Sequence, residues 1–346
     1  ALQPEIWTAS SNDALQMYIT ENGAATNFKP SFTYPIFGDS ETIFGYKDLT
    51  IFLCFDHCTF LPFLNVKYLE KLDKDDIVDP KLKLLEYLPE STVFKDEEKW
   101  IAATEEEQKE FKIPGKMLQG LHFQSEGDDF AIYVLDKHSS EALELHKRLQ
   151  ILVLLFIEAG SYIDISDELW DIYVLYKVTD TDTPSVVGFC TAYNYWKYPG
   201  AENFDNGVVT VRKKVSQFIL LPPYQGLGLG GKFYSILYNE WLKDEKIVEI
   251  LVEDPNEQFD DLRDRTDLAM IASAIDPRGD LKVSQLTSEW IEKTRLKYKL
   301  ESRQFSRLLE MLLLKDNNNS KKEIRLFVKQ RIYRINKEAL EGLDKP

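Results

Sequence analysis

The sequence predicts a mixed α/β protein, because three kinds of segment follow one another along its 346 residues. Short aromatic and β-branched runs, separated by Pro, Gly and Asp, come first and are typical of strands. A middle part alternates strand-like and helix-like segments, and the last part carries an apolar stripe at helical spacing. We therefore expect a central mixed β-sheet between a strand-rich N-terminal domain and a helical C-terminal domain.

Residues 1–112 are expected to form the strand-rich α/β domain. The runs "SFTYPIFG", "DLTIFLCF" and "TFLPFLNVKYL" are bounded by Pro, Gly and Asp, as strands usually are. The acidic segment from Asp96 to Phe111 predicts a helix. The breaker "IPG" at Ile113 to Gly115 then marks the boundary of this domain.

Residues 113–270 are expected to form the central domain. Ser140 is expected to cap a helix that Gly160 ends, between the strand "FAIYVLD" and a hairpin of "WDIYVLYKV" and "VVGFCTAYNYWKY". The strand "VSQFILL", a helix from Lys232 to Leu242 and the strand "IVEILVED" follow. The order of elements is therefore strand-helix-strand-strand-strand-helix-strand.

Residues 271–346 are expected to form the helical domain. An apolar stripe recurs at the spacing of a helix that packs on one side: Phe305, Leu308, Leu309, Leu312 and Leu313. The polar segment "KDNNNSKK" then leads to a last, basic helix.

The charge balance favours a basic partner. A net charge of −16 and a pI of about 4.9 give a surface field that repels nucleic acid and attracts cations. The longest apolar run, Ile151 to Ile157, is far shorter than the ~20 residues that cross a bilayer. We therefore expect an intracellular protein that binds neither nucleic acid directly nor a membrane.

The three cysteines and four histidines give little sign of a metal or redox site. Cys54, Cys58 and Cys190 have no paired spacing, which fits a reducing compartment. Cys54 and Cys58 enclose His57 but lack a second ligand pair, so no metal is expected. The sequence also offers no convincing Ser–His or Cys–His pair.

The segment "PPYQGLGLGGKFY", from Pro222 to Tyr234, fits three phosphate-binding patterns. The first is a P-loop, with Gly226 and Gly231 at the right spacing. This pattern fails at Phe233, because a P-loop needs Ser or Thr there to ligate Mg²⁺.

The second pattern is a dinucleotide fingerprint that begins at Gly226. Glu253 even stands at the end of the next strand, where a ribose-binding acid belongs. The fingerprint must follow the first strand of its fold directly, whereas here the Pro222-Pro223 pair intervenes late in the chain. The context therefore argues against a dinucleotide.

The third pattern, Gln225-x-x-Gly228-x-Gly230 between a strand and a helix, resembles the pyrophosphate loop of the GNAT N-acetyltransferases. Glycines let backbone N–H groups and a helix N-terminus approach a diphosphate without obstruction by a Cβ. The Pro222-Pro223 pair suits a strand that leaves its sheet and so can pair with a pantetheine arm. A glycine turn that serves only close packing is the structural alternative.

Longer segments resemble the fungal type B histone acetyltransferases, GNAT enzymes that acetylate newly made histone 4. "VSQFILLPPYQGLGLGGKFY" and "VEDPNEQFDDLRDRTD" carry the resemblance most closely. "YPIFGDSETIFGYKDL", "LLFIEAGSYID", "TAYNYWKY" and "RQFSRLLEMLLLK" extend it over nearly the whole chain. The resemblance implies a central GNAT catalytic domain in residues 113–270 and no metal. It also implies that acetyl-coenzyme A is bound by Phe218, Ile219, Leu220, Gln225, Gly226, Leu227, Gly228, Leu229, Gly230, Gly231, Asn256, Phe259 and Arg265.

The resemblance further implies a catalytic carboxylate. Glu253, with Asp254 beside it, would be the general base, and Glu158 a second candidate. A lysine amine has a pKa of about 10.4 and must lose a proton before it attacks a thioester. Partial burial and the neighbouring Asp254 would make Glu253 a stronger base. Direct attack needs no enzyme nucleophile.

Two segments would contact the histone tail: Asp39, Ser40 and Glu41, and Tyr193, Asn194 and Tyr195. Acidic residues crowd around the expected base with only Arg263 against them in the sequence, as suits a Lys- and Arg-rich tail. They are Glu249, Glu253, Asp254, Glu257, Asp260, Asp261 and Asp264. The resemblance also implies histone 3 as part of the carried complex, a WD40-repeat histone-binding partner, and residence in cytoplasm and nucleus.

Two other functions fit the same residues. One is an acetyltransferase for another protein or for a small amine. The other is a histone escort whose GNAT fold has lost catalysis, although an escort has no need of a diphosphate loop.

Overall fold

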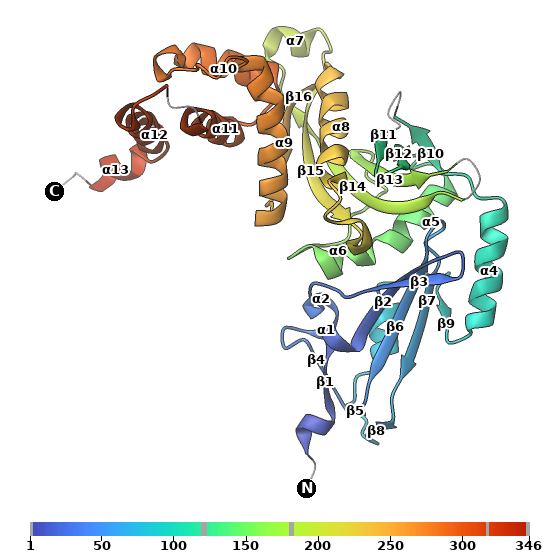
Figure 1. The fold of residues 1–346 in the computed structure, drawn as a ribbon. Helices are drawn as coiled ribbons and strands as arrows, with labels where there is room; N and C mark the ends of the chain where they lie inside the picture. Colours follow the sequence, from blue (N-terminus) through green and yellow to red (C-terminus); the bar gives the residue numbers. More distant parts are fainter. Residues whose placement is uncertain (1–2, 119–122, 180–182, 316–317, 344–346) are drawn as a thin grey trace. The chain divides into compact units, whose positions relative to one another are not determined.

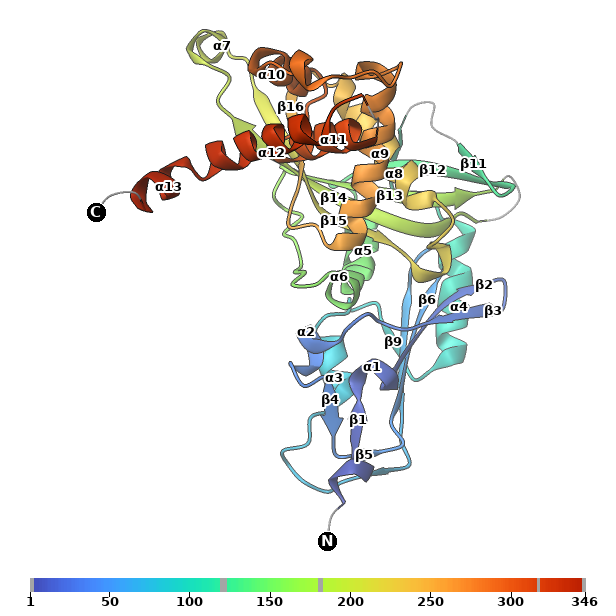
Figure 2. The same ribbon diagram turned by 60° about the vertical axis from the view of Figure 1, so that its left-hand side comes forward.

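The computed structural model describes residues 3–118, 123–179, 183–315 and 318–343 (Figures 1 and 2). The chain divides into two compact units. The first unit comprises Ala1–Tyr193 and Val215–Leu229, and the second comprises Asn194–Lys214 and Gly230–Pro346. The division into three domains at residues 112 and 270 stays a prediction.

Three sheets or ribbons form the N-terminal part of the first unit. A five-stranded mixed sheet has the order β3-β2-β6-β7-β9, in which β2 pairs in parallel with β6 and β7 with β9. These strands are β2 (Leu15–Glu21), β3 (Ala24–Phe28), β6 (Thr50–Asp56), β7 (Pro62–Lys67) and β9 (Val93–Phe94). Two short ribbons pair β1 (Thr8–Ser10) with β4 (Thr42–Phe44) and β5 (Tyr46–Lys47) with β8 (Glu70–Lys71).

The helices of the first unit lie before, between and after these strands. They are η1 (Pro4–Ile6), α1 (Ser11–Ala14), α2 (Tyr34–Phe37), α3 (Pro80–Leu85), α4 (Glu97–Lys109), α5 (Ser140–Leu149), α6 (Ile151–Phe156) and η2 (Pro222–Tyr224). The strand-rich N-terminal part and the acidic helix predicted from Asp96 to Phe111 are thus confirmed.

A seven-stranded sheet has the order β10-β12-β13-β14-β15-β16, with β11 paired to β12. Its strands are β10 (Gly115–Met117), β11 (Phe123–Ser125), β12 (Asp128–Leu135), β13 (Trp170–Val178), β14 (Ser185–Lys197), β15 (Thr210–Leu220) and β16 (Ile247–Val252). With the helices α5, α6 and α8 (Leu229–Lys243), the element order expected from the sequence is confirmed. The mixed α/β class is confirmed with it.

The helix expected from Ser140 to Gly160 differs from the prediction. It is two helices that meet at Gln150, whose side chain accepts a hydrogen bond from the Ile163 backbone N–H at 3.2 Å. Its N-cap is Ser139, one residue before the predicted cap. The second helix ends early because Ile157 is extended (φ −112°, ψ 116°).

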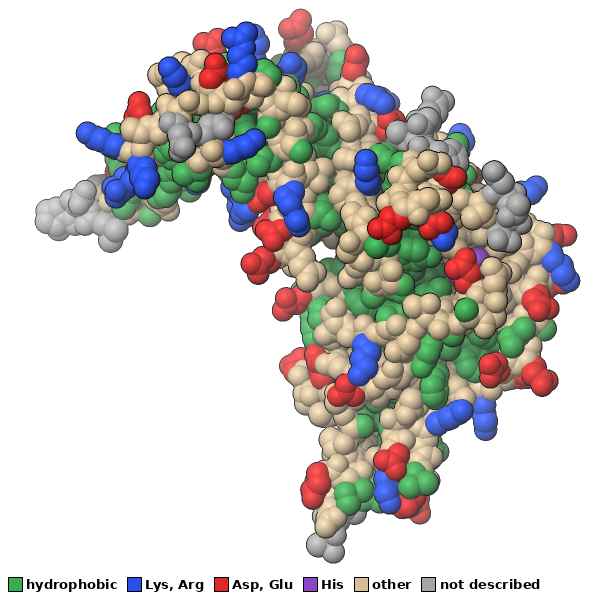
Figure 3. Space-filling view, in the orientation of Figure 1, with side chains coloured by type: hydrophobic (Ala, Val, Ile, Leu, Met, Phe, Trp, Pro, Cys, Tyr) green, Lys and Arg blue, Asp and Glu red, His purple; other side chains and the backbone are tan. Residues whose placement is uncertain are grey.

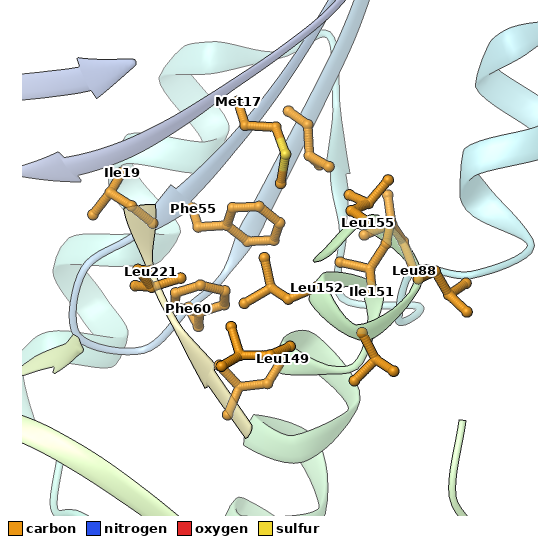
Figure 4. Close-up of a cluster of buried hydrophobic side chains, with 14 of the residues drawn as sticks. Met17, Ile19, Phe55, Phe60, Leu88, Leu149, Ile151, Leu152, Leu155 and Leu221 are labelled. Atoms are coloured by element: carbon orange, nitrogen blue, oxygen red, sulfur yellow. The ribbon is translucent and has the colours of Figure 1, made fainter. Parts of the chain in front are cut away.

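The first unit has an apolar core into which the end of β15 reaches. Figure 4 shows Leu221 beside Ile19 and Phe60, with residues of α5 and α6 completing the cluster. Leu221 is fully buried and its backbone N–H donates to the Val187 carbonyl at 2.9 Å. The strand that leads into the glycine-rich segment is therefore fixed at its end.

The second unit is mainly helical. Its helices are α7 (Ala201–Asp205), α8 after its first residue, α9 (Glu257–Ile275), η3 (Val283–Gln285), α10 (Ser288–Lys297), α11 (Ser302–Lys315), α12 (Lys321–Ile335) and α13 (Lys337–Leu343). All five residues of the predicted apolar stripe on α11 are buried, so that prediction is confirmed. The predicted basic last helix begins at α12, over which Figure 3 shows Lys and Arg side chains beside apolar ones.

Helix α9 was not expected from the sequence. Its buried residues include Arg263, Asp264 and Asp267, so the positions that face the interior carry charge. The Gln304 amide donates to Asp264 at 2.9 Å and to Asp267 at 3.1 Å, and the Tyr234 hydroxyl donates to Asp267 at 3.0 Å. A polar network therefore joins α8, α9 and α11.

Candidate active site

The glycine-rich segment forms an open turn between β15 and α8. Gly226 and Gly228 adopt φ +79° and +75°, in the left-handed region that favours glycine. No atom lies within 4 Å of where a Cβ would stand at either residue. The backbone of the turn is exposed, and α8 begins directly after it at Leu229, which is buried together with Gly230.

Gln225 holds this turn to the strand before it. Its side-chain amide donates to the Leu220 carbonyl at 2.8 Å, and its backbone N–H donates to the Pro222 carbonyl at 3.1 Å. An exposed glycine backbone at the start of a 15-residue helix fits a diphosphate, because it presents N–H groups without side-chain obstruction.

The residues expected to bind pantetheine alternate along the end of β15. Ile219 is buried in the apolar core, whereas Phe218 and Leu220 are half-buried. Gln217 is buried on the same face of the strand as Ile219. Its side chain accepts a hydrogen bond from the Thr191 hydroxyl at 3.0 Å and donates one to the Ser161 carbonyl at 2.8 Å. The strand is thus well ordered where a ligand arm would lie along it.

Glu253 directly follows β16 and is paired with an amine. The Lys214 Nζ lies 2.5 Å from its Oε1, 3.0 Å from the Tyr195 hydroxyl and 4.7 Å from the Tyr195 ring centroid. The Lys214 side chain is 13% exposed and that of Glu253 41% exposed. Burial opposes the charge of Lys214, but its hydrogen bonds to Glu253 and Tyr195 and the nearby negative charge raise its pKa. Asp254 is exposed and adopts φ +35°.

The acidic residues around Glu253 meet more cations than the sequence suggested. Glu249 pairs with Arg212 at 2.9 Å and with Arg295 at 3.6 Å. Asp264 is buried and pairs with Arg307. The expectation that only Arg263 opposes the cluster is therefore wrong. In the folded protein, cations from distant segments of the chain pair with its acidic residues. Besides Glu253, the exposed members of the cluster are Asp254, Glu257 and Asp261.

Known proteins resemble this chain over its whole length. A catalytic subunit of type B histone acetyltransferase from Debaryomyces hansenii is 60% identical over 100% of this chain and 86% of its own. The proteins of the same name from Candida albicans and Cryptococcus neoformans are 55% and 34% identical over 99% and 98% of this chain, and 86% and 92% of theirs. Residues 7–158 match the family "Histone acetyl transferase HAT1 N-terminus" and residues 264–318 match "Fungal HAT1, C-terminal".

The chain belongs to the type B histone acetyltransferase family. It is therefore an acetyltransferase, and the resemblance inferred from its motifs is confirmed. A solved aminoglycoside acetyltransferase from a soil metagenomic sample, in complex with sisomicin, covers 40% of this chain and 86% of its own, at 15% identity and a TM-score of 0.30. That likeness is too loose to bear on fold or function.

Other expected cofactor residues of the acetyltransferase lie at the N-cap and in the first half of α9. Asn256 caps this helix, since its side-chain oxygen accepts from the Phe259 N–H at 2.9 Å. The Phe259 ring packs edge-on against Tyr234 at 5.9 Å, and Arg265 is exposed and donates to the Asp261 carbonyl at 3.1 Å. Their roles toward the cofactor stay predictions.

The segments expected to touch the substrate differ in how free their side chains are. Asp39 and Ser40 are exposed between α2 and β4, whereas the Glu41 carboxylate accepts a hydrogen bond from the Asn12 amide. Tyr193 donates from its hydroxyl to Asp167 at 2.9 Å and is therefore tied to the first unit.

Two adjacent expected residues belong instead to the second unit. Asn194 is half-buried, and Tyr195 is 44% exposed and in contact with Lys214. Tyr195, Lys214 and Glu253 thus form one cluster within that unit. The sequence predicts Tyr195 and Glu253 as site residues but does not identify Lys214. Glu158, the second candidate base, is exposed after α6 in the first unit.

A Ser–His pair exists that the sequence did not reveal. The His57 Nδ1 lies 2.7 Å from the Ser185 hydroxyl, which also lies 3.2 Å from Glu21. His57 and Ser185 are each only 2% exposed, so a substrate cannot reach them. No spacing could have predicted this pair, because its members are 128 positions apart. We assign it a structural role.

The described part of the acetyltransferase has neither a cluster of metal ligands nor a helix that could span a membrane. Among residues 3–118, 123–179, 183–315 and 318–343, no group of three or more His, Cys, Asp or Glu could hold a metal ion. Within the described part of the chain, no helix has the length and apolar character needed to cross a membrane.

Proposed function

We propose that this acetyltransferase moves the acetyl group of acetyl-coenzyme A to lysine ε-amines in the N-terminal tail of newly made, free histone 4. Glu253 is the general base, with Asp254 beside it and Glu158 as the second candidate. The observation that carries this proposal is the Lys214 amine on the Glu253 carboxylate, 2.5 Å away and beside the Tyr195 ring. A carboxylate next to an aromatic ring is a setting that accepts an alkylammonium group.

The chemistry follows from the groups present. Acetyl-coenzyme A supplies a thioester, whose carbonyl carbon accepts an amine. Glu253 takes the proton from the acceptor lysine, so that the C–N bond forms as the C–S bond breaks and coenzyme A leaves as the thiolate. The open glycine turn would hold the diphosphate, and Phe218 to Leu220 would lie along the pantetheine arm.

Direct transfer is favoured by the state of the candidate nucleophiles. Burial, with a smaller effect of Glu97, raises the pKa of Cys54 to about 12, so this thiol is not ionised at neutral pH. Burial likewise raises the pKa of Cys58, and the His57–Ser185 pair is inaccessible. An amine that attacks the thioester directly needs none of them.

The partners follow from charge and from the names of relatives. A chain of net charge −16 attracts basic tails, which supports histone 4 as substrate and histone 3 as part of the bound complex. Relatives are named catalytic subunits, which fits a second subunit, for which we propose a WD40-repeat histone-binding protein. A histone that is acetylated soon after synthesis would be met in the cytoplasm and the nucleus.

The test is a mass-spectrometric assay with acetyl-coenzyme A and a histone 4 tail peptide. We expect acetylated lysine, and Glu253→Gln should lower kcat by about 100-fold or more with little change in acetyl-coenzyme A affinity by calorimetry. Glu245→Gln is the matched control, because Glu245 is an exposed carboxylate just before β16.

Each rival function gives a different result in this assay. Equal activity on a free polyamine and on the peptide would indicate an acetyltransferase for small amines. Peptide binding without acetylation would indicate an inactive escort. Unchanged kcat in Glu253→Gln would remove Glu253 as the base.

A further inference from the structure

The contact between Lys214 and Glu253 is a short ion pair in which the Lys214 side chain is largely covered. Lys214 is on β15 and Glu253 follows β16, strands that are neighbours in the sheet. The Lys214 ammonium is also held by the Tyr195 hydroxyl at 3.0 Å, from the neighbouring strand β14. Three adjacent strands thus bring one side chain each to the same point.

This arrangement restricts both charged groups. The Lys214 side chain is only 13% exposed, so water screens its ammonium less than it screens a surface lysine. An ammonium group at hydrogen-bond distance stabilises the ionised form of a carboxylate and fixes its orientation. Glu253 is 41% exposed and follows the last residue of its strand, and the contact with Lys214 limits the rotamers open to its side chain.

We propose that Lys214 is a positioning residue of the acetyltransferase, whose ammonium group orients the Glu253 carboxylate and keeps it ionised, and so able to accept a proton, at mildly acid pH. The inference rests on the proposed role of Glu253 as general base. Lys214 itself is not the acceptor, because its ammonium group is held by two partners, the Glu253 carboxylate and the Tyr195 hydroxyl.

Other charged groups around Glu253 act differently. Asp254, the next residue, and Glu257, the first residue of α9, carry like charge and would oppose its ionisation. Tyr195 faces it from β14 through Lys214. Arg212, two positions before Lys214 on the same strand, is occupied by Glu249 at 2.9 Å, and Arg295 of α10 also pairs with Glu249 at 3.6 Å. Lys214, in contrast, is in direct contact with Glu253.

The experiment is a pH profile of kcat/KM on a histone 4 tail peptide for wild type, Lys214→Met and Lys214→Arg. In Lys214→Met the rising acid limb should move to higher pH by about 1 unit, the lower end of the effect of a contacting opposite charge. Lys214→Arg keeps the positive charge, so its acid limb should lie within about a few tenths of a pH unit of the wild-type limb.

Arg212→Met is the matched control, because it removes the same charge from the same strand but from a different carboxylate. The acid limb of its kcat/KM profile should lie at the same pH as that of the wild type. A limb that moves equally in Arg212→Met and Lys214→Met would show a general field effect and overturn the inference. Lower kcat/KM in Lys214→Met at every pH, with an unmoved limb, would also overturn it, since Lys214 would then act only on structure.

Failure of this inference can be told from failure of the proposed function. If Glu253→Gln is inactive but the Lys214→Met limb is unmoved, only the role of Lys214 is wrong. If Glu253→Gln is fully active, the base is another group and both proposals fall. Thermal unfolding of each variant, compared with wild type at neutral pH, verifies that the kinetics report folded protein.

Discussion

A substitution at Gly228 tests most directly whether the glycine turn binds acetyl-coenzyme A. The φ of +75° at Gly228 costs a non-glycine residue ~1–2 kcal/mol. Its missing Cβ faces open space that a diphosphate would fill. Gly228→Ala should therefore weaken acetyl-coenzyme A binding in calorimetry by about tenfold or more, the equivalent of ~1.4 kcal/mol of lost contact.

Gly207 provides the control for backbone strain alone. It adopts φ +73°, also has no atom within 4 Å of a Cβ position, and lies between α7 and β15. Gly207→Ala should lower the free energy of unfolding by a similar amount and leave the affinity for acetyl-coenzyme A unchanged. Equal affinities in the two variants would mean that the turn at Gly228 does not touch the cofactor.

At the residue scale, sequence motifs predicted the turn but not the partners of its neighbours. The glycines and the position of Glu253 after a strand follow from local spacing. The Lys214–Glu253 pair joins residues 39 positions apart and depends on which strands are adjacent in the sheet. The cations that oppose Glu249 and Asp264 are equally remote in sequence, so the local charge count overestimated the acidity of this region.

At the scale of single elements, the start of α5 gives a sharp test. The Ser139 hydroxyl accepts from the Ala142 N–H at 3.0 Å, whereas the Ser140 hydroxyl donates to the Glu141 carboxylate at 3.1 Å. Ser139→Ala should lower the free energy of unfolding by about 1 kcal/mol, and Ser140→Ala by much less. Urea unfolding of both variants measures this, and the reverse order would restore Ser140 as the cap.

Helices α9 and α11 show why some elements could be predicted and others could not. The stripe of α11 is apolar and buried, so its period was visible in the sequence. The buried face of α9 carries Arg263 and Asp267, which pair with each other at 3.5 Å, and Asp267 also accepts hydrogen bonds from Tyr234 of α8 and Gln304 of α11. A helix whose interior face is polar has no apolar period, so only its Asn256 cap could have revealed it.

At the scale of the whole molecule, the two units should respond to acid in opposite directions. In the second unit, burial raises the pKa of Asp267 to about 6, against the lowering effects of Arg263, Tyr234 and Gln304. The unfolded chain has the ordinary carboxyl pKa of about 3.9, so the folded state binds the proton more tightly. Protonation of Asp267 therefore stabilises the second unit as pH falls from about 6 to about 4.

His146 gives the first unit the opposite dependence. It is fully buried on α5, neither ring nitrogen has a hydrogen-bond partner among the described residues, and burial lowers its pKa to about 4. The unfolded imidazole, with a pKa of about 6.5, takes up a proton that the folded state excludes. His146 therefore contributes about 3 kcal/mol of stability to the first unit, which is lost as pH falls from about 6.5 to about 4.

Hydrogen exchange at pH 7 and pH 5, corrected for the intrinsic exchange rate, separates these two effects. Acid should lower the opening free energy of amides in α5 and raise that of amides in α9. His146→Leu should remove most of the change in α5 alone, and Asp267→Asn most of the change in α9 alone. Because each variant removes one titrating group from one unit, a shift that persists in both variants would have to come from other groups, and this assignment would be wrong.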